Sequence, residues 1–295
     1  MTKTIATISI TKSFSDFSSA IFVTAALLVA VPAHAATDNL TTCDRLAAHP
    51  DDKDKPSDIK GSYDIAKADV ATALKACKAA VTAPDAPRRA WFELGRAYEY
   101  NRQKADAAKA YRKAVDAGNT TAMVGLGTLL VNGDGVKKDE SEARALFEKA
   151  ANAGDVMGMS NLGALYGAGL GVPEDFTTAR NWYEKAAAAD SSEAMFQLGL
   201  MTQDGDGGPK DDAAAKIWFE KAAEHNHGGA LERLGAYAEE GRAGQKDEKT
   251  AIAFYKRAAD FGSDDAADAL QRLRCKFTMK DKDGKVVGNI CYTGD

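Results

Sequence analysis

The chain has no excess of basic residues: 38 lysines and arginines stand against 43 aspartates and glutamates, and the formal net charge is −5. A nucleic-acid-binding surface uses basic side chains to displace counterions, so this balance argues against a nucleic-acid partner. The chain also lacks an apolar run that could span a bilayer. Its run at residues 20–31 is well short of the roughly 20 residues that a transmembrane helix needs. We therefore expect no stable membrane insertion.

Catalytic motifs are equally scarce. There is no Gly-x-Ser-x-Gly motif, the pattern that presents a nucleophilic serine in hydrolases. His225 and His227 have no third histidine or free cysteine beside them in the sequence, whereas a zinc site needs three or four ligands. Ser57 and Lys60 match the serine–x–x–lysine pattern of penicillin-recognising enzymes, but its companion motifs are absent. We expect no catalytic residue, no metal site and no cofactor.

The N-terminus has the pattern of an export signal. Lys3 and Lys12 precede the apolar run, and Ala33-His34-Ala35 follows it as a small-residue cleavage site. We expect residues 1–35 to be a signal peptide that is cleaved after Ala35, and the mature protein to be periplasmic or secreted. An uncleaved anchor is the alternative.

Export would place the cysteines in an oxidising compartment. The chain has only four: Cys43, Cys77, Cys275 and Cys291. An even number in an oxidising compartment predicts two disulfides, with three possible pairings. We favour Cys43–Cys77 and Cys275–Cys291, because each pair lies at its own end of the chain. The second pair flanks a strand–turn–strand pattern centred on Asp283, which predicts a β-hairpin within residues 274–295. With all four paired, no thiol nucleophile remains.

What the chain has in abundance is a repeat with a step of 36 residues. Such a period is typical of stacked-repeat proteins. In the copy that begins at Gly158, the spacing of Leu162, Leu165 and Tyr166 is that of a helix face, and Gly163 allows a second helix to approach closely. The Leu-Gly pair and the Lys/Arg-Ala-Ala triplet recur in each copy, as Leu126-Gly127, Leu162-Gly163, Leu198-Gly199 and Leu234-Gly235, and as Lys149-Ala150-Ala151, Lys185-Ala186-Ala187, Lys221-Ala222-Ala223 and Arg257-Ala258-Ala259.

The helix ends repeat as regularly as the helix faces. Four aspartates at the repeat step precede the second helix of each copy, where a carboxylate accepts from free backbone N–H groups: Asp139, Asp175, Asp211 and Asp247. The residues that follow the same helix are of the types that tolerate a left-handed backbone: Gly154, Asp190, Asn226 and Gly262.

Neither helix of a copy can bury its apolar face alone, so successive pairs must stack. We expect an all-α protein, an α-solenoid of antiparallel helix pairs over residues 87–273. A weaker upstream copy begins near Leu94-Gly95. A disulfide-tied helical cap is expected over residues 36–86. Within it we expect the polar stretch at residues 51–61 to be a mobile loop and His49 to be exposed.

The run from Leu162 to Ala187, with its Gly169-x-Gly171 loop, Asp175 and Trp182-Tyr183, resembles the Sel-1-like repeat, a relative of the tetratricopeptide repeat. The resemblance covers about residues 120–263. It implies a right-handed superhelix that binds other proteins, and exported bacterial members act as adaptors, assembly factors or regulators in the cell envelope. A β-lactam or peptidoglycan hydrolase is the alternative, because cysteine-rich relatives are linked with penicillin binding. Those relatives carry cysteines inside their repeats, and this chain does not.

In the related tetratricopeptide architecture the first helix of each pair lines a concave groove. We therefore expect a protein or peptide ligand in such a groove, either extended or helical. The alternative is that these positions are ordinary surface. The candidate positions avoid the Leu-Gly face and change from basic and aromatic to acidic along the chain: Arg89, Phe92, Arg96, Tyr100, Val124, Thr128, Ser160, Ala164, Phe196, Gln203, Glu232 and Glu239.

Overall fold

The computed structural model describes residues 33–275, 277–280, 282–283 and 285–290. The predicted signal peptide lies almost wholly outside these residues. Helices account for most of the described chain, and they follow one another as α1 (Ala33–Ala47), α2 (Val70–Ala80), α3 (Arg88–Tyr100), α4 (Lys104–Asp116), α5 (Thr120–Asn132), α6 (Glu140–Asn152), α7 (Val156–Ala168), α8 (Phe176–Ala188), α9 (Ser192–Asp204), α10 (Asp212–Glu224), α11 (Gly228–Glu240), α12 (Glu248–Asp260) and α13 (Asp264–Arg274).

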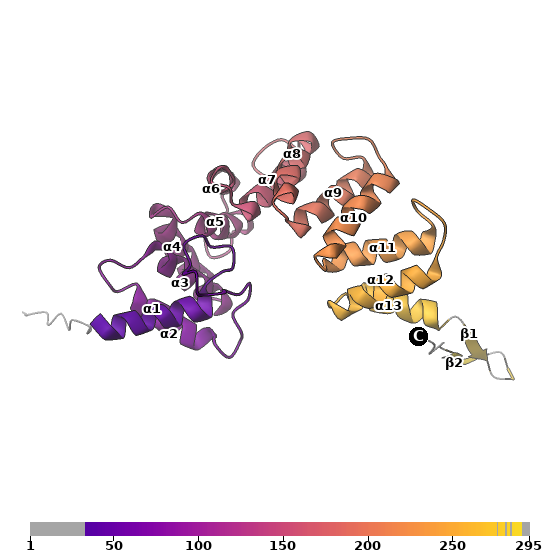
Figure 1. Cartoon of the computed structure of the whole chain (residues 1–295), viewed down its shortest axis with the longest axis horizontal. Coiled ribbons are helices and arrows are strands. Elements are labelled where there is room, and N and C mark those ends of the chain that lie inside the picture. Colours follow the sequence, from indigo (N-terminus) through magenta and orange to yellow (C-terminus); the bar gives the residue numbers. More distant parts are fainter. Residues whose placement is uncertain (1–32, 276, 281, 284, 291–295) are drawn as a thin grey trace, which may run out of the picture.

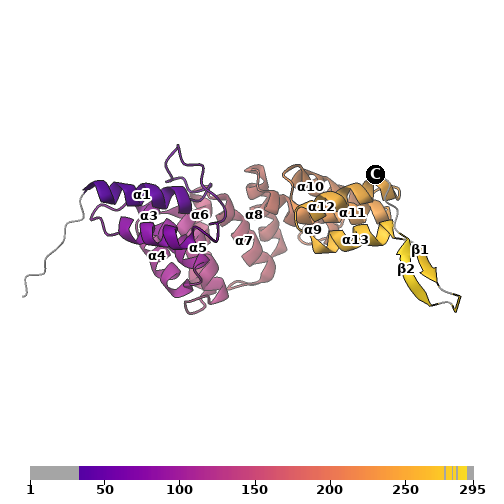
Figure 2. The same cartoon turned by 90° about the horizontal axis from the view of Figure 1, so that it is seen from below.

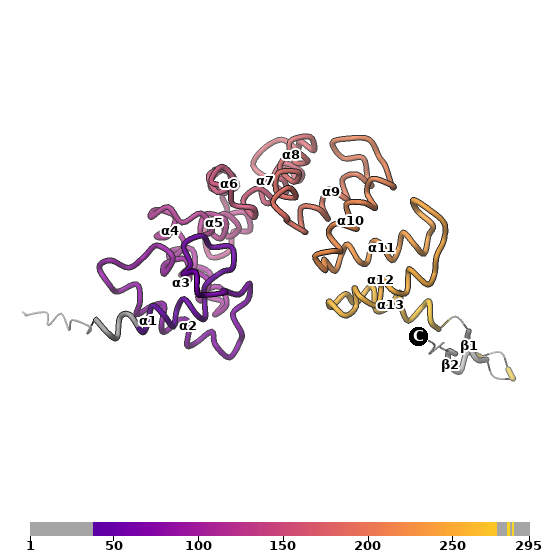
Figure 3. The backbone as a smooth tube through the Cα atoms, viewed as in Figure 1, coloured from indigo at the N-terminus to yellow at the C-terminus, as the bar shows by residue number. Residues whose placement is uncertain are grey.

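The helices form antiparallel pairs that stack along the chain and curve into an arch (Figure 1). Seen from below, the arch is long and narrow, with its first and last helices at opposite ends (Figure 2). The backbone trace shows the same curvature from α3 to α13 (Figure 3). The prediction of an all-helical solenoid over the repeats is confirmed. Among the described residues, no helix has the length and apolar character that crossing a membrane requires.

In each repeat, one glycine of the first helix packs closely against an aromatic ring of the second helix. A Cβ on Gly163 of α7 would lie 2.9 Å from Cε1 of Tyr183 on α8, which is closer than van der Waals contact allows. The backbones can therefore meet only because the side chain is absent, as the sequence predicted. Five pairs share this geometry: Gly95 with Tyr111, Gly127 with Phe147, Gly163 with Tyr183, Gly199 with Phe219, and Gly235 with Tyr255.

The predicted helix ends are confirmed. Asp139 and Asp175 each accept a hydrogen bond from the backbone N–H three residues on, at 2.9 and 3.0 Å, and Asp211 and Asp247 do the same. The residues predicted to be left-handed all have positive φ: Gly154 (76°), Asp190 (64°), Asn226 (59°) and Gly262 (88°). A second series, at the start of α5, α7, α9, α11 and α13, was not predicted: Asn119, Asp155, Ser191, His227 and Ser263 cap those helices.

The two ends of the chain differ from the repeats. A disulfide joins Cys43 on α1 to Cys77 on α2, which confirms that predicted pairing. Beyond α13, strands β1 (Phe277–Lys280) and β2 (Val286–Ile290) pair antiparallel. Cys275 is not a free thiol. Cys291 lies outside the described residues, so the Cys275–Cys291 pairing stays a prediction.

Candidate functional site on the inner face of the arch

The polar segment between α1 and α2 lies on the inside of the arch (Figure 1). We call residues 49–64 the docked loop. Its two ends meet, because the N–H of Ser62 donates to the carbonyl oxygen of Ala48 at 3.0 Å. Gly61 turns the chain there with φ 72°, and a Cβ at that position would lie 2.9 Å from the backbone of His49. The expectation of a mobile loop is therefore corrected, since backbone and side-chain bonds hold the segment in one place.

Arg96 on α3 fixes the base of the docked loop. Its guanidinium is buried, and it donates to the carbonyl oxygens of Ala47 (2.7 Å), Ser62 (2.8 Å) and Tyr63 (2.5 Å). Tyr100, one turn further along the helix, donates its hydroxyl to Asp64 at 2.7 Å. Arg96 and Tyr100 were both predicted to meet a partner, but in the structure they bind the chain's own loop.

The docked loop also covers the aromatic part of the predicted groove. Phe92 is 3% exposed and lies edge-on to His49, with ring centroids 6.4 Å apart. His49 itself is 9% exposed, so the expectation that it is exposed is wrong. Burial, together with the positive charge of Arg96, lowers the pKa of His49 to about 4. The imidazole is therefore neutral beneath the loop at physiological pH.

A buried acidic group lies behind this part of the site. Glu93 is fully buried on α3, and burial together with the neighbouring Asp44 raises the pKa of its carboxyl well above the usual range. Arg89, also predicted to face a partner, instead pairs with Asp44 on α1 at 2.9 Å. Glu93 lies beside the Cys43–Cys77 disulfide, and these three residues have potential ligand atoms within 4.8 Å of one another. Because both sulfurs are already joined, the group offers no thiolate to a metal.

The tip of the docked loop reaches the start of α5. The Nδ2 of Asn119 donates to Asp52 (3.1 Å) and Asp54 (2.9 Å), while its Oδ1 caps the helix by accepting from the N–H of Ala122. Asp54 in turn pairs with Arg88, with both oxygens 2.6 Å from guanidinium nitrogens. One asparagine thus joins the loop, the helix end and the ion pair into a single polar network.

Two cationic side chains of the N-terminal region donate hydrogen bonds to backbone carbonyl oxygens just after a helix. The ammonium of Lys53 donates to the carbonyl oxygens of Ala153 (2.8 Å) and Gly154 (3.3 Å), which follow α6. The Nη1 of Arg88 donates to those of Ala117 (3.4 Å) and Gly118 (3.2 Å), which follow α4. The carbonyls at a helix C-terminus lack intrahelical partners and carry the negative end of the helix dipole, so they attract cations.

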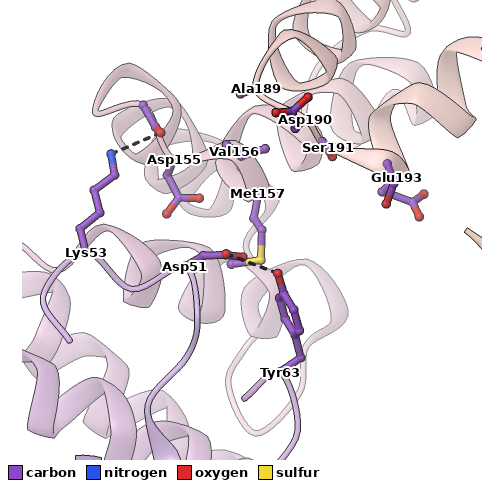
Figure 4. A pocket seen from close by; sticks show the side chains of 12 residues that line it. Asp51, Lys53, Tyr63, Asp155, Val156, Met157, Ala189, Asp190, Ser191 and Glu193 are labelled. Atoms are coloured by element: carbon purple, nitrogen blue, oxygen red, sulfur yellow. Dashed lines mark hydrogen bonds between the residues drawn. The ribbon is translucent and has the colours of Figure 1, made fainter. Parts of the chain in front are cut away.

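Past the docked loop the inner face is open, and a cavity of about 510 Å³ begins there. Figure 4 shows its two walls: Asp51, Lys53 and Tyr63 from the loop face Met157 at the start of α7 and Glu193 on α9. Ala189, Asp190 and Ser191 form the floor between α8 and α9. Asp155, another wall residue, is 4% exposed, and burial raises the pKa of its carboxyl. The carboxylates of Asp51, Asp190 and Glu193 outnumber the one cationic side chain of the lining, Lys53, so the cavity carries a net negative charge.

The next gap along the inner face is filled by side chains. The ring of Phe196 stacks on His227, with centroids 4.6 Å apart, and the Nε2 of His227 lies 3.1 Å from Glu193. His225 and His227 thus lie at a helix junction, where His227 caps α11. Beyond this stack a second open cavity of about 520 Å³ contains Glu232, whose carboxylate accepts from Ser263 at 2.8 Å.

The remaining predicted groove residues differ in their burial and in their contacts. Val124 and Gln203 are buried, at 5% and 8% exposure. Thr128 and Ala164 line a smaller cavity of about 150 Å³ between α5 and α7, and the hydroxyl of Ser160 lies 3.4 Å from that of Ser191. Glu239 binds Arg272 at 2.9 Å.

The residues of the alternative hydrolase motif lie elsewhere. Ser57 and Lys60 are exposed in the outer turn of the docked loop and not at the start of a helix. A nucleophilic serine needs an activating base and an oxyanion site within hydrogen-bond reach. Nothing in the arrangement of this turn favours the hydrolase interpretation.

The fold and the inner-face cavities define a helical-repeat scaffold of the kind that binds other proteins. Comparisons with known proteins narrow the class. The Sel1 repeat profile matches residues 120–155, 156–191, 192–227 and 229–263. The crystal structure of a Sel1 repeat protein from Oxalobacter formigenes is 31% identical, with 70% of this chain and 88% of that chain covered and a TM-score of 0.63. The chain therefore belongs to the Sel1 repeat family.

A second solved structure is also similar. It is a protective antigen present in uropathogenic Escherichia coli strains displaying an SLR fold, and it is 26% identical with a TM-score of 0.62. The alignment covers 81% of this chain and 49% of that one. A search of curated proteins gave no match.

Proposed function

We propose that this protein is an exported, non-catalytic scaffold that binds a segment of another protein along the open part of its inner face. Sel1 repeat proteins are generally protein-binding scaffolds, and their fold is typically non-catalytic. The observation that carries the proposal is that the inner face is covered at its beginning and open further along the chain. The docked loop covers α3 and the start of α5, whereas cavities of about 510 and 520 Å³ are open from α7 onward.

The proposed place of action is outside the cytoplasm, in the envelope or beyond it. The Cys43–Cys77 disulfide supports this proposal, because disulfides persist in oxidising compartments. The signal-like pattern of residues 1–35 supports it independently. In that setting the protein would act as an adaptor, assembly factor or regulator of the protein that it binds.

Site-specific photo-crosslinking in the producing cell tests the proposal. A photoreactive phenylalanine analogue replaces Ser192 or Glu232 on the inner face, and Glu184 or Lys221 on the exposed side of the second helices serves as the matched control. We expect one adduct of defined mass from the inner positions and none from the controls. Equal labelling from both sets, or no adduct from the inner set, would refute the proposal.

A further inference from the structure

Each repeat ends its second helix in the same way, with a C-cap residue followed by a left-handed residue. We call the two carbonyl groups of these residues the repeat corner. Five such corners recur at the repeat step, after α4, α6, α8, α10 and α12. The first three are Ala117–Gly118, Ala153–Gly154 and Ala189–Asp190. These carbonyl oxygens follow the last helical turn, beside the negative end of the helix dipole.

The first two corners are each occupied by a cation of this chain. Arg88 occupies the first corner, at 3.4 and 3.2 Å, and Lys53 occupies the second, at 2.8 and 3.3 Å. The two cations have no common position in the sequence, since Arg88 begins α3 and Lys53 belongs to the docked loop. The geometry of the corner, and not a local sequence pattern, therefore selects the cation.

The third corner is the floor of the open cavity of about 510 Å³ (Figure 4). Within the described part of the chain, no lysine or arginine donates to the carbonyl oxygens of Ala189 or Asp190. The cavity adds negative charge to this corner. The side chains of Asp51 and Glu193 are 46% and 58% exposed, and Asp190 carries a carboxylate where the first two corners have glycine.

The fourth corner follows α10 and differs from the first three. The stack of Phe196 on His227 fills the gap beside it. Arg257 already donates to the side chain of Asn226 at 3.3 Å and to the carbonyl oxygen of Ala223 at 3.2 Å. The first three corners thus comprise two that hold a cation of this chain, followed by one that holds none. The fifth corner, Phe261–Gly262 after α12, borders the second cavity.

We propose that the Ala189–Asp190 corner binds a lysine or arginine side chain of the partner protein. The cation would lie as Lys53 lies on the preceding corner, one repeat further along. Its guanidinium or ammonium would donate to the two carbonyl oxygens and would face the carboxylates of Asp190 and Glu193. This inference rests on the proposed function and names the partner's chemistry: a basic segment that continues along the inner face from the docked loop.

Titration followed by backbone amide NMR on the full chain tests the corner. The probe is the peptide acetyl-Gly-Ser-Lys-Ser-Gly-amide, and the matched control carries Nζ-acetyl-lysine, which keeps the length and removes the charge. We expect saturable shifts at residues 189–193 with the lysine peptide. The control should bind at least about tenfold more weakly, because charge-assisted hydrogen bonds are the stronger kind.

Two variants sharpen the test. Asp190→Gly keeps the left-handed backbone, which glycine adopts at the corresponding corners, and removes only the carboxylate. It should weaken binding several-fold without changing the melting temperature. Lys53→Ala vacates the second corner and should add a second set of shifts at residues 153–157. No saturable shift at residues 189–193, or equal affinity for the acetylated control, would overturn the inference.

The crosslinking experiment distinguishes a failure of this inference from a failure of the proposed function. If the corner has no role, the inner-face crosslinks persist and Asp190→Gly leaves their yield unchanged. If the scaffold proposal fails, the crosslinks themselves are absent from Ser192 and Glu232.

Discussion

The ammonium of Lys53 lies 2.8 Å from the carbonyl oxygen of Ala153, a residue 100 positions later in the chain. Through this contact the docked loop reaches the end of α6. It therefore extends one helix pair beyond α3 and α4, although Arg96 of α3 binds its base. The N-terminal region is therefore more than a cap on the end of the solenoid. It occupies the beginning of the inner face, and the proposed binding surface starts where the docked loop ends.

Removing the anchor of the docked loop should release it. Arg96→Met leaves the carbonyl oxygens of Ala47, Ser62 and Tyr63 without their donor, and we expect a loss of about 2–4 kcal/mol in unfolding free energy. Trypsin should then cleave after Lys60 at a higher rate in native buffer. Arg45→Gln, an exposed arginine on α1, is the control and should change neither quantity. Unchanged cleavage in Arg96→Met would show that Arg96 does not hold the loop.

Alanine substitutions at two glycines of α7 distinguish the cost of losing close packing from the gain in helix propensity. Gly163→Ala places a methyl group against the buried ring of Tyr183 and should destabilise the protein by about 1–3 kcal/mol. At Gly167 the nearest atom to an added Cβ is the methyl of Ala179 at 3.6 Å, so Gly167→Ala should be neutral or stabilising by up to about 1 kcal/mol. Chemical denaturation of both variants measures the difference. Similar values for the two would contradict the packing argument.

The N-terminal disulfide should stabilise the region that carries the docked loop. Cys43→Ala with Cys77→Ala removes a crosslink between residues 34 positions apart, and we expect a loss of about 2–4 kcal/mol. Thermal unfolding with and without reductant measures it. Wild-type protein should lose stability on reduction, whereas the double variant should lose much less. A melting temperature of the variant equal to that of the oxidised wild type would be incompatible with this role.

His49 should make stability depend on pH. Its pKa is lowered to about 4 in the folded protein by burial and by Arg96, against the ordinary 6.5 of the unfolded chain. Between these values the unfolded chain binds the extra proton, so stability is complete above about pH 6.5 and falls as the pH approaches 4. We expect protonation of His49 in the unfolded chain to lower the unfolding free energy by about 1–3 kcal/mol between these two pH values.

The matched variant for this prediction is His49→Asn, whose amide oxygen can still accept from the N–H of Asp51 as Nδ1 does at 3.2 Å. The carboxylates titrate in both proteins, so the difference between the two stability curves isolates His49. Parallel curves from pH 7 to pH 4 would mean that His49 is not buried as a neutral group.

The repeats could be predicted in detail because their signals are local. Asp175 caps α8 through a residue three positions away, and Gly262 satisfies a backbone angle at its own position. The glycine beneath an aromatic ring could also be predicted, since Gly163 and Tyr183 belong to one helix pair. The caps of the first helices were not predicted, because four different residue types occupy that position in five copies: Asn119, Asp155, Ser191, His227 and Ser263. Their shared chemistry, a side-chain acceptor at a step of 36 residues from Asn119, was the available signal.

The positions on α3 were assigned to the inner side, but their occupancy was not predicted. Phe92 and Arg96 are covered by residues some 30 to 50 positions earlier, and the polar composition of that segment resembles that of any solvated loop. The groups that bind Lys53 are backbone carbonyls, which every sequence has and which carry no side-chain signature.

The sequence by itself determined the helix pairs, their caps and stops, and their close contacts, because each depends on residue types at short, fixed spacing. Only the tertiary structure decided which part of the inner face is filled and which is open. That outcome depends on where a curved stack of helices brings distant segments together, and on carbonyl groups whose direction is set by the fold and not by the residue that carries them.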